Sequence, residues 1–336
     1  MVDLIEKAKL KIGCDALEDY LITPTKFPAT LDADSPELSA VINHSSFLEI
    51  AKRYEQNDNT AITSQRKFKN FAHQATWAIG VAAISGSLIA GLSAASFEPN
   101  SFLTVVLFML GLTSTIGGGY AVYRLYQIKN EKLLERWMAA RANAETERLG
   151  YFNALSRCLV KKYKTDIYLH LLFVCMFKRY QLEVQRLYYN SRSVDHRKSL
   201  ETTSIIGGIA ALCLALGSGM LGMIGAFNQE LLPFAALGTI GAAISAIASR
   251  REDLNQDERN SERYSRTSDT LSKIAERYDD VLNIVNQGKN PEIIIEYVDA
   301  VNDQLSLEHR QWTSNALEMS SALSALEESI SELHKG

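Results

Sequence analysis

The sequence contains one pattern typical of a nucleotide-binding enzyme, the glycine spacing GSGMLG at residues 217–222. A dinucleotide fingerprint follows a strand and opens a helix, so that amide groups at the helix end face the pyrophosphate. This spacing instead falls in the middle of an apolar run. The six histidines share no metal-ligand spacing, and no Ser/His/Asp grouping or phosphate loop has a suitable context. We therefore predict that the chain is not an enzyme and uses no metal or cofactor.

Charge and cysteine usage argue against two further classes. Lysine and arginine number 35 against 39 aspartates and glutamates, a net charge of −4 that argues against nucleic acid as a partner. The four cysteines, Cys14, Cys158, Cys175 and Cys213, have no CxxC spacing. Cys213 lies inside an apolar run. We interpret them as reduced thiols rather than as a disulfide or zinc framework.

Weakly polar residues inside four long apolar runs are the next candidates for function. The runs contain no Asp, Glu, Lys, Arg or His, which argues against ion-coupled transport because that mechanism needs ionisable groups at depth. A pore through them would be lined by hydroxyl side chains such as Ser85, Thr113, Ser218 and Ser245. Such a lining predicts poor ion selectivity. The alternative is that each hydroxyl bonds back to its own helix.

Two acidic residues, Glu98 and Glu230, occupy the short turns between paired runs. In an oligomer they would form acidic rings at the outer mouth of a pore. The alternative is that both are ordinary solvated turn residues.

Small residues recur every four positions along the runs and would let helices approach closely. The members of these columns that we select are Ala82 and Gly86, Gly111 and Gly119, and Gly207 and Gly219. They favour a packed bundle of helices within or between subunits, and we expect a homo-oligomer.

The elements that position these residues are the apolar runs themselves, at 75–97, 102–123, 204–227 and 231–249. A helix needs about 20 apolar residues to cross a bilayer, and these runs approach or exceed that length. They are apolar on all sides, whereas a helix in a soluble core usually keeps a polar stripe. The sequence therefore predicts two transmembrane hairpins, with the lipid bilayer as a partner. A buried hairpin in a soluble helical protein is the alternative.

Basic residues flank the outer ends of both predicted hairpins, for example Lys67, Arg124, Arg197 and Arg251. Such residues collect on the cytoplasmic side of membrane spans. We therefore predict a multi-pass protein with both termini in the cytoplasm.

The remaining segments predict helices outside the membrane. Amphipathic spacing indicates one helix at 3–22 and a second at about 36–54, which ends at the polar stretch EQNDNT. The apolar segment LHLLFVCMF is too short to span and is expected in a helical core. The predicted fold class is thus an all-α polytopic membrane protein with two hairpins and a cytoplasmic helical bundle.

The hairpin and the helix that leaves it occur twice in the chain. When the chain is compared with itself, Arg124 aligns with Arg251, Trp137 with Tyr264 and Tyr151 with Tyr278. The predicted domains are a soluble segment at 1–60, a first unit at 61–158 with its exit helix at 124–157, a second unit at 159–320 with its exit helix at 250–285, and a tail at 321–336.

The exit helix carries the motif ERWMAARANAETERLGYF at residues 135–152, and the second unit ends with EHRQW at 308–312. The chain resembles the SLATT family over residues from about 60 to 315, although the second copy has Tyr264 for the tryptophan and Ser272 for the glutamate. Trp137, Arg141 and Glu145 line successive turns of one helix, so together with Tyr264 and Trp312 they are expected to contact a facing helix or a partner.

The resemblance implies a function in bacterial antiphage defence. Members of the family are thought to be pore-forming or membrane-disrupting effectors of the bacterial inner membrane, switched on by a nucleotide signal or by a sensor protein encoded nearby. Growth arrest or death of the infected cell would follow. Two alternatives stay open, a non-conducting membrane anchor for a cytoplasmic defence complex and a constitutive channel or transporter.

Overall fold

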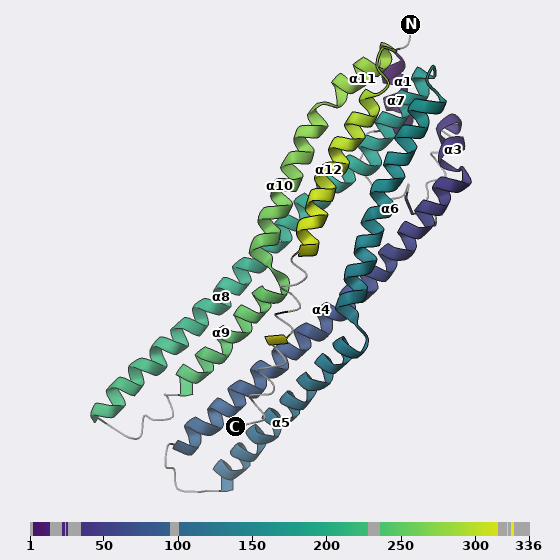
Figure 1. The fold of residues 1–336 in the computed structure, drawn as a ribbon. Coiled ribbons are helices and arrows are strands. Elements are labelled where there is room, and N and C mark those ends of the chain that lie inside the picture. The colour runs from purple at the N-terminus through teal and green to yellow at the C-terminus, as the bar shows by residue number, and fades with distance from the viewer. Residues whose placement is uncertain are drawn as a thin grey trace. The chain divides into compact units, whose positions relative to one another are not determined.

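The computed structural model describes residues 3–13, 22–23, 25, 35–94, 101–227, 236–314, 321 and 324–325. That part of the chain is helical and contains no strand, which confirms the predicted all-α class (Figure 1). The helices are α1 (Leu4–Ile12), α3 (Pro36–Ile42), α4 (Ser45–Ala94), α5 (Ser101–Asn130), α6 (Leu133–Lys162), α7 (Ile167–Phe177), the π-helix η3 (Lys178–Leu182), α8 (Glu183–Phe227), α9 (Ala236–Asn255), α10 (Asp257–Glu276), α11 (Tyr278–Asn286) and α12 (Ile293–Ser314).

Three helical segments are long and apolar enough to cross a membrane, within Ser45–Ser93, Ser101–Asn130 and Ile167–Gly219. The first residues of the fourth predicted run, 231–235, lie outside the described part, and α9 covers the rest of it. In the most apolar stretch of α5 no residue is buried. Such a surface is covered by lipid or by another apolar surface, because water would oppose its exposure.

The predicted end of the second helix at EQNDNT is wrong, because α4 runs unbroken through this stretch. Its residues are moderate helix formers and include neither glycine nor proline. Buried Ala51, Tyr54 and Ala61 recur at helical spacing on either side of it, so packing carries the helix through. The break comes earlier, at residues 43–44 between α3 and α4.

The first predicted helix is shorter than expected, since α1 ends at Ile12. Gly13 has a φ of 75°, in the left-handed region that glycine adopts at helix ends. Both exit helices are also bent soon after their hairpins, where Lys132 and Gln256 each have a φ of 50°. No other non-glycine residue in the described part has a positive φ.

The chain forms two compact units, and each combines segments from both sequence repeats. Unit 1 comprises Met1–Thr63, Arg136–Asp195 and Arg259–Asn315, and unit 2 comprises Ser64–Glu135, His196–Glu258 and Ala316–Gly336. Two helices, α4 and α8, contribute residues to both units.

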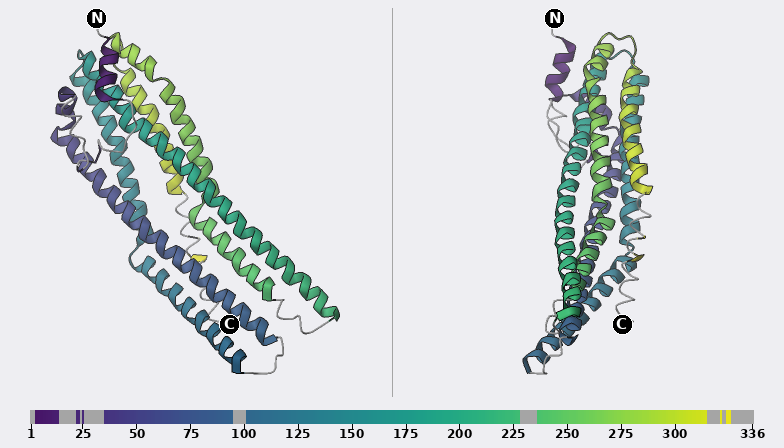
Figure 2. Two further views of the ribbon diagram at one scale, coloured as in Figure 1. Left: turned by 180° about the vertical axis from the view of Figure 1, so that it is seen from behind. Right: turned by 90° about the vertical axis from the view of Figure 1, so that its left-hand side faces the viewer.

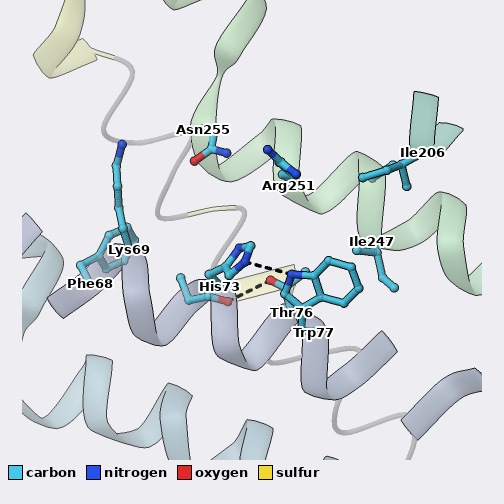
Figure 3. A pocket seen from close by; sticks show the side chains of 11 residues that line it. Phe68, Lys69, His73, Thr76, Trp77, Ile206, Ile247, Arg251 and Asn255 are labelled. Carbon is cyan, nitrogen blue, oxygen red and sulfur yellow. Dashed lines mark hydrogen bonds between the residues drawn. The ribbon is translucent and has the colours of Figure 1, made fainter. Parts of the chain in front are cut away.

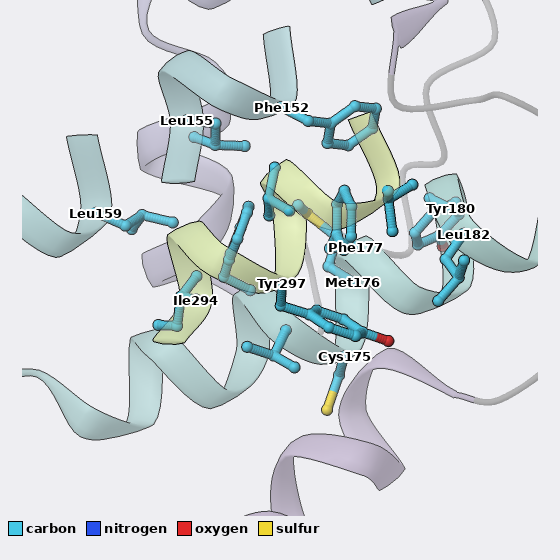
Figure 4. Packing of buried hydrophobic residues seen from close by; sticks show 14 of the residues in the cluster. Phe152, Leu155, Leu159, Cys175, Met176, Phe177, Tyr180, Leu182, Ile294 and Tyr297 are labelled. Carbon is cyan, nitrogen blue, oxygen red and sulfur yellow. The ribbon is translucent and has the colours of Figure 1, made fainter. Parts of the chain in front are cut away.

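Unit 1 is built around α7, in which every residue from Leu169 to Phe177 is buried. Phe177 lies edge-on to Phe152 and to Tyr297, with ring centroids 5.5 and 5.8 Å apart (Figure 4). Helix α1 adds Ile5 to the same core. The apolar segment LHLLFVCMF is therefore the centre of a helical core.

Unit 2 contains the two hairpins, in which α5 lies beside α4 and α9 beside α8 (Figure 2). Gly117 of α5 approaches the Ala78 carbonyl so closely that an added Cβ would lie 3.0 Å from it. Gly241 of α9 lies similarly close to α8, and a Cβ added to it would lie 2.7 Å from the Ala210 carbonyl oxygen. Ser114 Oγ also donates to the Ala82 carbonyl across the first hairpin, at 3.1 Å.

Candidate functional site

Unit 1 encloses a group of charged side chains that we call the ionic cluster. It contains three arginines and three carboxylates from four helices: Asp58 on α4, Arg141, Glu145 and Arg148 on α6, Arg263 on α10, and Glu308 on α12. The formal charges of these groups balance.

Helix α6 supplies the centre of the ionic cluster because Arg141, Glu145 and Arg148 fall on one face at helical spacing. Arg141 Nη2 lies 2.6 Å from Glu145 Oε1, and Arg148 Nε lies 3.4 Å from Glu145 Oε2. Arg141 Nη1 also reaches Asp58 of α4 at 3.5 Å. The side chains of Glu145 and Arg148 are only 7% and 4% exposed, so both ions are largely removed from water.

Tyr54 connects α4 to the same face of α6. The Arg148 guanidinium lies over the Tyr54 ring, 4.9 Å from its centroid, and donates a hydrogen bond to the Tyr54 hydroxyl. Helix α4 thus meets α6 through both an ion pair and a cation–π contact.

Glu308 forms the other side of the ionic cluster. The Tyr189 hydroxyl of α8 donates to Glu308 Oε2 at 2.9 Å, and Arg263 Nε lies 3.5 Å from Glu308 Oε1. The Glu308 and Arg263 side chains are 9% and 10% exposed. Glu308 therefore connects α12 to α8 and α10 inside unit 1.

The two buried glutamates differ in their pKa. Burial opposes the ionisation of Glu145, but Arg141 and Arg148 outweigh it and lower its pKa below the ordinary value. Burial raises the pKa of Glu308, and Arg263 and the Tyr189 hydrogen bond offset it only in part. Glu145 is therefore the better stabilised carboxylate of the two.

Aromatic side chains border the ionic cluster. The Trp137 and Trp312 rings meet edge to face with centroids 5.6 Å apart, and the His309 ring stacks on Trp312 at 6.1 Å. The Tyr264 ring lies 5.5 Å from that of Tyr189. These rings help to exclude water from the ion pairs beside them.

The structure therefore brings all five predicted exit-helix contact residues into one region of unit 1. Arg141 and Glu145 belong to the ionic cluster, and Trp137, Tyr264 and Trp312 border it. The sequence did not indicate Arg148 on the same helix, or the partners on other helices, which are Asp58, Tyr54, Tyr189, Arg263 and Glu308. Glu308 opens the EHRQW motif, which was the one signal for its place.

The ionic cluster has no reactive nucleophile and consists of paired ions. Burying ion pairs usually contributes little net stability, because desolvation cancels most of their attraction, whereas removing one partner is costly. Such a network specifies one arrangement of its helices strongly. In the described structure it holds α4, α6, α10 and α12 together.

The predicted pore hydroxyls differ in their exposure, and two of them bond within their own helices. Ser85 is buried, whereas Thr113, Ser218 and Ser245 are exposed. Thr113 donates to the Met109 carbonyl at 2.8 Å, in its own helix. The Ser218 hydroxyl likewise donates to the Ala215 carbonyl of its own helix, at 3.1 Å.

The acidic turn residues Glu98 and Glu230 lie outside the described residues. Their predicted place at the mouth of a pore stays a prediction.

The five selected glycines make no close contact with the described part of the chain, and their predicted packing role stays a prediction. Ala82 is buried, but a Cβ added at the other five positions would meet nothing within 4 Å: Gly86, Gly111, Gly119, Gly207 and Gly219. The close approaches inside the hairpins are made by Gly117, Gly217 and Gly241 instead.

No protein-family model matches the chain, and comparisons with curated proteins and with solved structures found no match. Within the described residues no group of three or more His, Cys, Asp or Glu side chains is arranged to hold a metal ion. The function is therefore argued from the geometry and from the sequence motifs.

Proposed function

We propose that this chain is a bacterial antiphage effector that permeabilises the inner membrane when a partner protein or a nucleotide signal activates it. In this proposal two hairpins cross the membrane and both termini and unit 1 lie in the cytoplasm. Unit 1 keeps the membrane helices in a closed arrangement until the signal arrives. The motifs shared with the SLATT family at residues 135–152 and 308–312 support the antiphage role.

The continuity of α4 and α8 is the observation that carries the proposal. Helix α4 holds Tyr54 and Asp58 against the ionic cluster and continues, without a break, into an apolar segment that ends at Ala94. Helix α8 holds Tyr189 and continues to Phe227 in the same manner. A change in the ionic cluster is therefore applied directly to helices whose far ends are apolar and free of charge.

Aromatic residues support a membrane interface near the start of the first apolar segment. Trp77 of α4 and Tyr120, Tyr123 and Tyr126 of α5 are all exposed. The Tyr120 hydroxyl donates to Gln74 Oε1 at 3.0 Å, which ties these two helices together at that level. Exposed tryptophan and tyrosine collect where hydrocarbon meets headgroups.

The exposed apolar face of α5 supports insertion into lipid. Phe102, Val105, Phe108, Leu112 and Ile116 are between 43% and 77% exposed over four turns of the helix. The glycines of α4, α5 and α8 that have no neighbour within 4 Å offer places where a second copy of the chain can approach closely, which supports a homo-oligomer.

Membrane potential in bacteria tests the proposal. The chain is expressed alone and together with its genomic neighbours, and a potential-sensitive dye is followed during phage infection. We expect depolarisation upon infection with the wild-type chain. Glu145→Gln breaks the centre of the ionic cluster and should depolarise cells without infection, because unit 1 no longer holds one arrangement of α4 and α6.

Glu262→Gln is the matched control for this variant. Glu262 pairs with Arg266 at 3.3 Å, but the two side chains are 66% and 81% exposed, so the pair is screened by water. This variant should behave like the wild type. An unchanged potential in every case, with the protein present in the membrane, would exclude the pore and favour the anchor. Leakage of the wild type without infection would favour a constitutive channel.

A further inference from the structure

Unit 2 contains a pocket that the proposed effector function does not use. It lies where α4 faces α8 and α9, and it is lined by Phe68, Lys69, Ala72, His73, Thr76, Trp77, Ile206, Ile247, Ala248, Arg251 and Asn255 (Figure 3). Residues from both hairpins of unit 2 therefore line the pocket.

The pocket has a basic end and an apolar end. Figure 3 shows Lys69 toward one end, beside Phe68, and Ile206 and Ile247 toward the other, with Arg251 between them. Among the described residues that line the pocket, none is a carboxylate. An anion with an attached apolar group therefore matches both ends.

Arg251 is held in place beside the pocket. Its Nη2 donates to Ser199 Oγ of α8 at 3.3 Å. Asp257 is a nearby carboxylate, but His196 Nδ1 lies 2.6 Å from its Oδ1, and the Ser199 hydroxyl donates to its Oδ2. His196 and Ser199 make the hydrogen bonds to Asp257, and the positive charge of Arg251 also helps to lower the pKa of that carboxylate.

Trp77 and His73 place the pocket at the level of the aromatic residues described above. The Trp77 indole donates to His73 Nε2 at 2.9 Å, and Trp77 is 45% exposed. In the proposed topology this level is the cytoplasmic interface, where anionic headgroups meet basic side chains of membrane helices.

We propose that this pocket binds an anionic phospholipid, with its phosphate between Lys69 and Arg251 and its glycerol and first methylenes against Trp77, Ile206 and Ile247. The inference rests on the proposed membrane insertion. It adds a lipid that joins the two hairpins of unit 2 and so favours one arrangement of α4 against α9.

The sequence repeat provides an internal contrast. Arg124 aligns with Arg251 and follows the first hairpin in the same way. However, its guanidinium lies over the rings of Phe71 and Tyr120, at 4.8 and 4.9 Å, and donates to the Tyr120 hydroxyl. Arg124 is thus engaged by its own hairpin, and it does not line the pocket.

The test measures the melting temperature of the full chain, purified in a neutral detergent, after addition of phosphatidylglycerol or phosphatidylcholine at equal mole fraction. We expect phosphatidylglycerol to raise the melting temperature by about 2–4 °C more than phosphatidylcholine does. The double variant Lys69→Gln/Arg251→Gln should lose this difference. Lys67→Gln/Arg124→Gln removes the same two charge types at the same level outside the pocket and should keep it.

Three outcomes would overturn the lipid site. The first is an equal shift with both lipids, and the second is an equal loss in the two double variants. The third is a full shift with sn-glycerol 3-phosphate alone, because a soluble phosphate would then suffice. Extraction of membranes with alkaline carbonate separates this failure from that of the proposed function: a chain that stays in the membrane but does not distinguish the lipids refutes only the lipid site.

Discussion

Unit 1 and unit 2 place their charged and apolar side chains in opposite ways. Unit 1 buries Glu145, Arg148 and Glu308 among aromatic rings. Unit 2 leaves the apolar side chains of α5 on its surface, and none of the residues in the most apolar stretch of that helix is buried. Each unit thus carries a feature that is unfavourable in water unless something compensates for it. In unit 1 the compensation is a set of specific ionic partners, and in unit 2 it would be the lipid of the proposed membrane insertion.

The largest expected effect comes from breaking the ionic cluster of unit 1. Glu145→Gln should lower the free energy of unfolding by about 3–5 kcal/mol, because Arg141 and Arg148 lose their shared buried partner. Denaturant unfolding followed by tryptophan fluorescence measures it, since Trp137 and Trp312 lie beside the ionic cluster. The exposed glutamate variant Glu262→Gln should change the value by less than about 0.5 kcal/mol. Equal effects of the two variants would remove the contrast between buried and exposed pairs.

The next effect concerns the exposed apolar surface of α5 in unit 2. Leu112→Lys introduces a charge near the middle of the second apolar run and should disfavour insertion by roughly 2.5–3.5 kcal/mol. The measurement is the fraction of the chain that resists carbonate extraction. Leu10→Lys in unit 1 changes a residue that is 81% exposed on α1 and should leave this fraction unchanged. Full membrane retention of Leu112→Lys would show that α5 does not face hydrocarbon.

A pH series compares the two buried glutamates of unit 1. The folded-state pKa of Glu308 is raised, so the folded state loses stability relative to the unfolded chain as pH rises from about 4.3 through that raised value. The pKa of Glu145 is lowered, so its stabilisation is present above about 4.3 and is lost as pH falls through the lowered value. Glu308→Gln should therefore remove the loss of folding stability that occurs as pH rises above about 4.3. Glu145→Gln should remove the loss of folding stability that occurs as pH falls below about 4.3. Parallel curves for both variants and the wild type would contradict the assignment.

The smallest effect distinguishes a hydroxyl that joins two membrane helices from one that serves its own helix. Ser114→Ala should cost about 0.6 kcal/mol, because Ser114 donates to the Ala82 carbonyl of α4. Thr115→Ala should cost less, since Thr115 donates to Gly111 in its own helix. Thermal unfolding in detergent compares the two variants. A larger effect of Thr115→Ala would be inconsistent with the observed hydrogen bonds.

Much of the fold could be predicted from local patterns. The all-α class followed from the long apolar runs and the helical spacing. The segment LHLLFVCMF was predictable as core because nine mostly apolar residues are too few to cross a bilayer. The continuity of α4 could not be predicted, since its polar stretch at residues 55–60 is held helical by the burial of Tyr54 and Ala61. Packing therefore decided the helix where composition suggested a break.

The composition of the candidate site was predictable along α6 but not between helices. Arg141 and Glu145 are four residues apart, and that spacing alone places them on one face. Asp58, Arg263 and Glu308 come from three other helices, and no local spacing indicates that they meet.

The glycine columns of the hairpins show a similar limit. Gly117 and Gly119 both belong to columns of small residues, but only Gly117 faces α4. Spacing along one helix defines its faces, whereas the rotation of that helix about its axis is decided by its neighbour.

The bends at Lys132 and Gln256 make the two helices of each hairpin different, because only the outgoing helix is followed by a bend. The chain reaches the hairpins through α4 and α8, which have no bend there, and leaves them through a left-handed kink that costs about 1–2 kcal/mol at a non-glycine residue. A helix of 50 residues such as α4 is a stiff rod of about 75 Å. We therefore expect a rotation of α4 or α8 to be carried along that helix, whereas the bend at Lys132 or Gln256 would let the outgoing helix change direction. Each hairpin should therefore respond to a rotation of its incoming helix, α4 or α8, and much less to a rotation of the helix that leaves it.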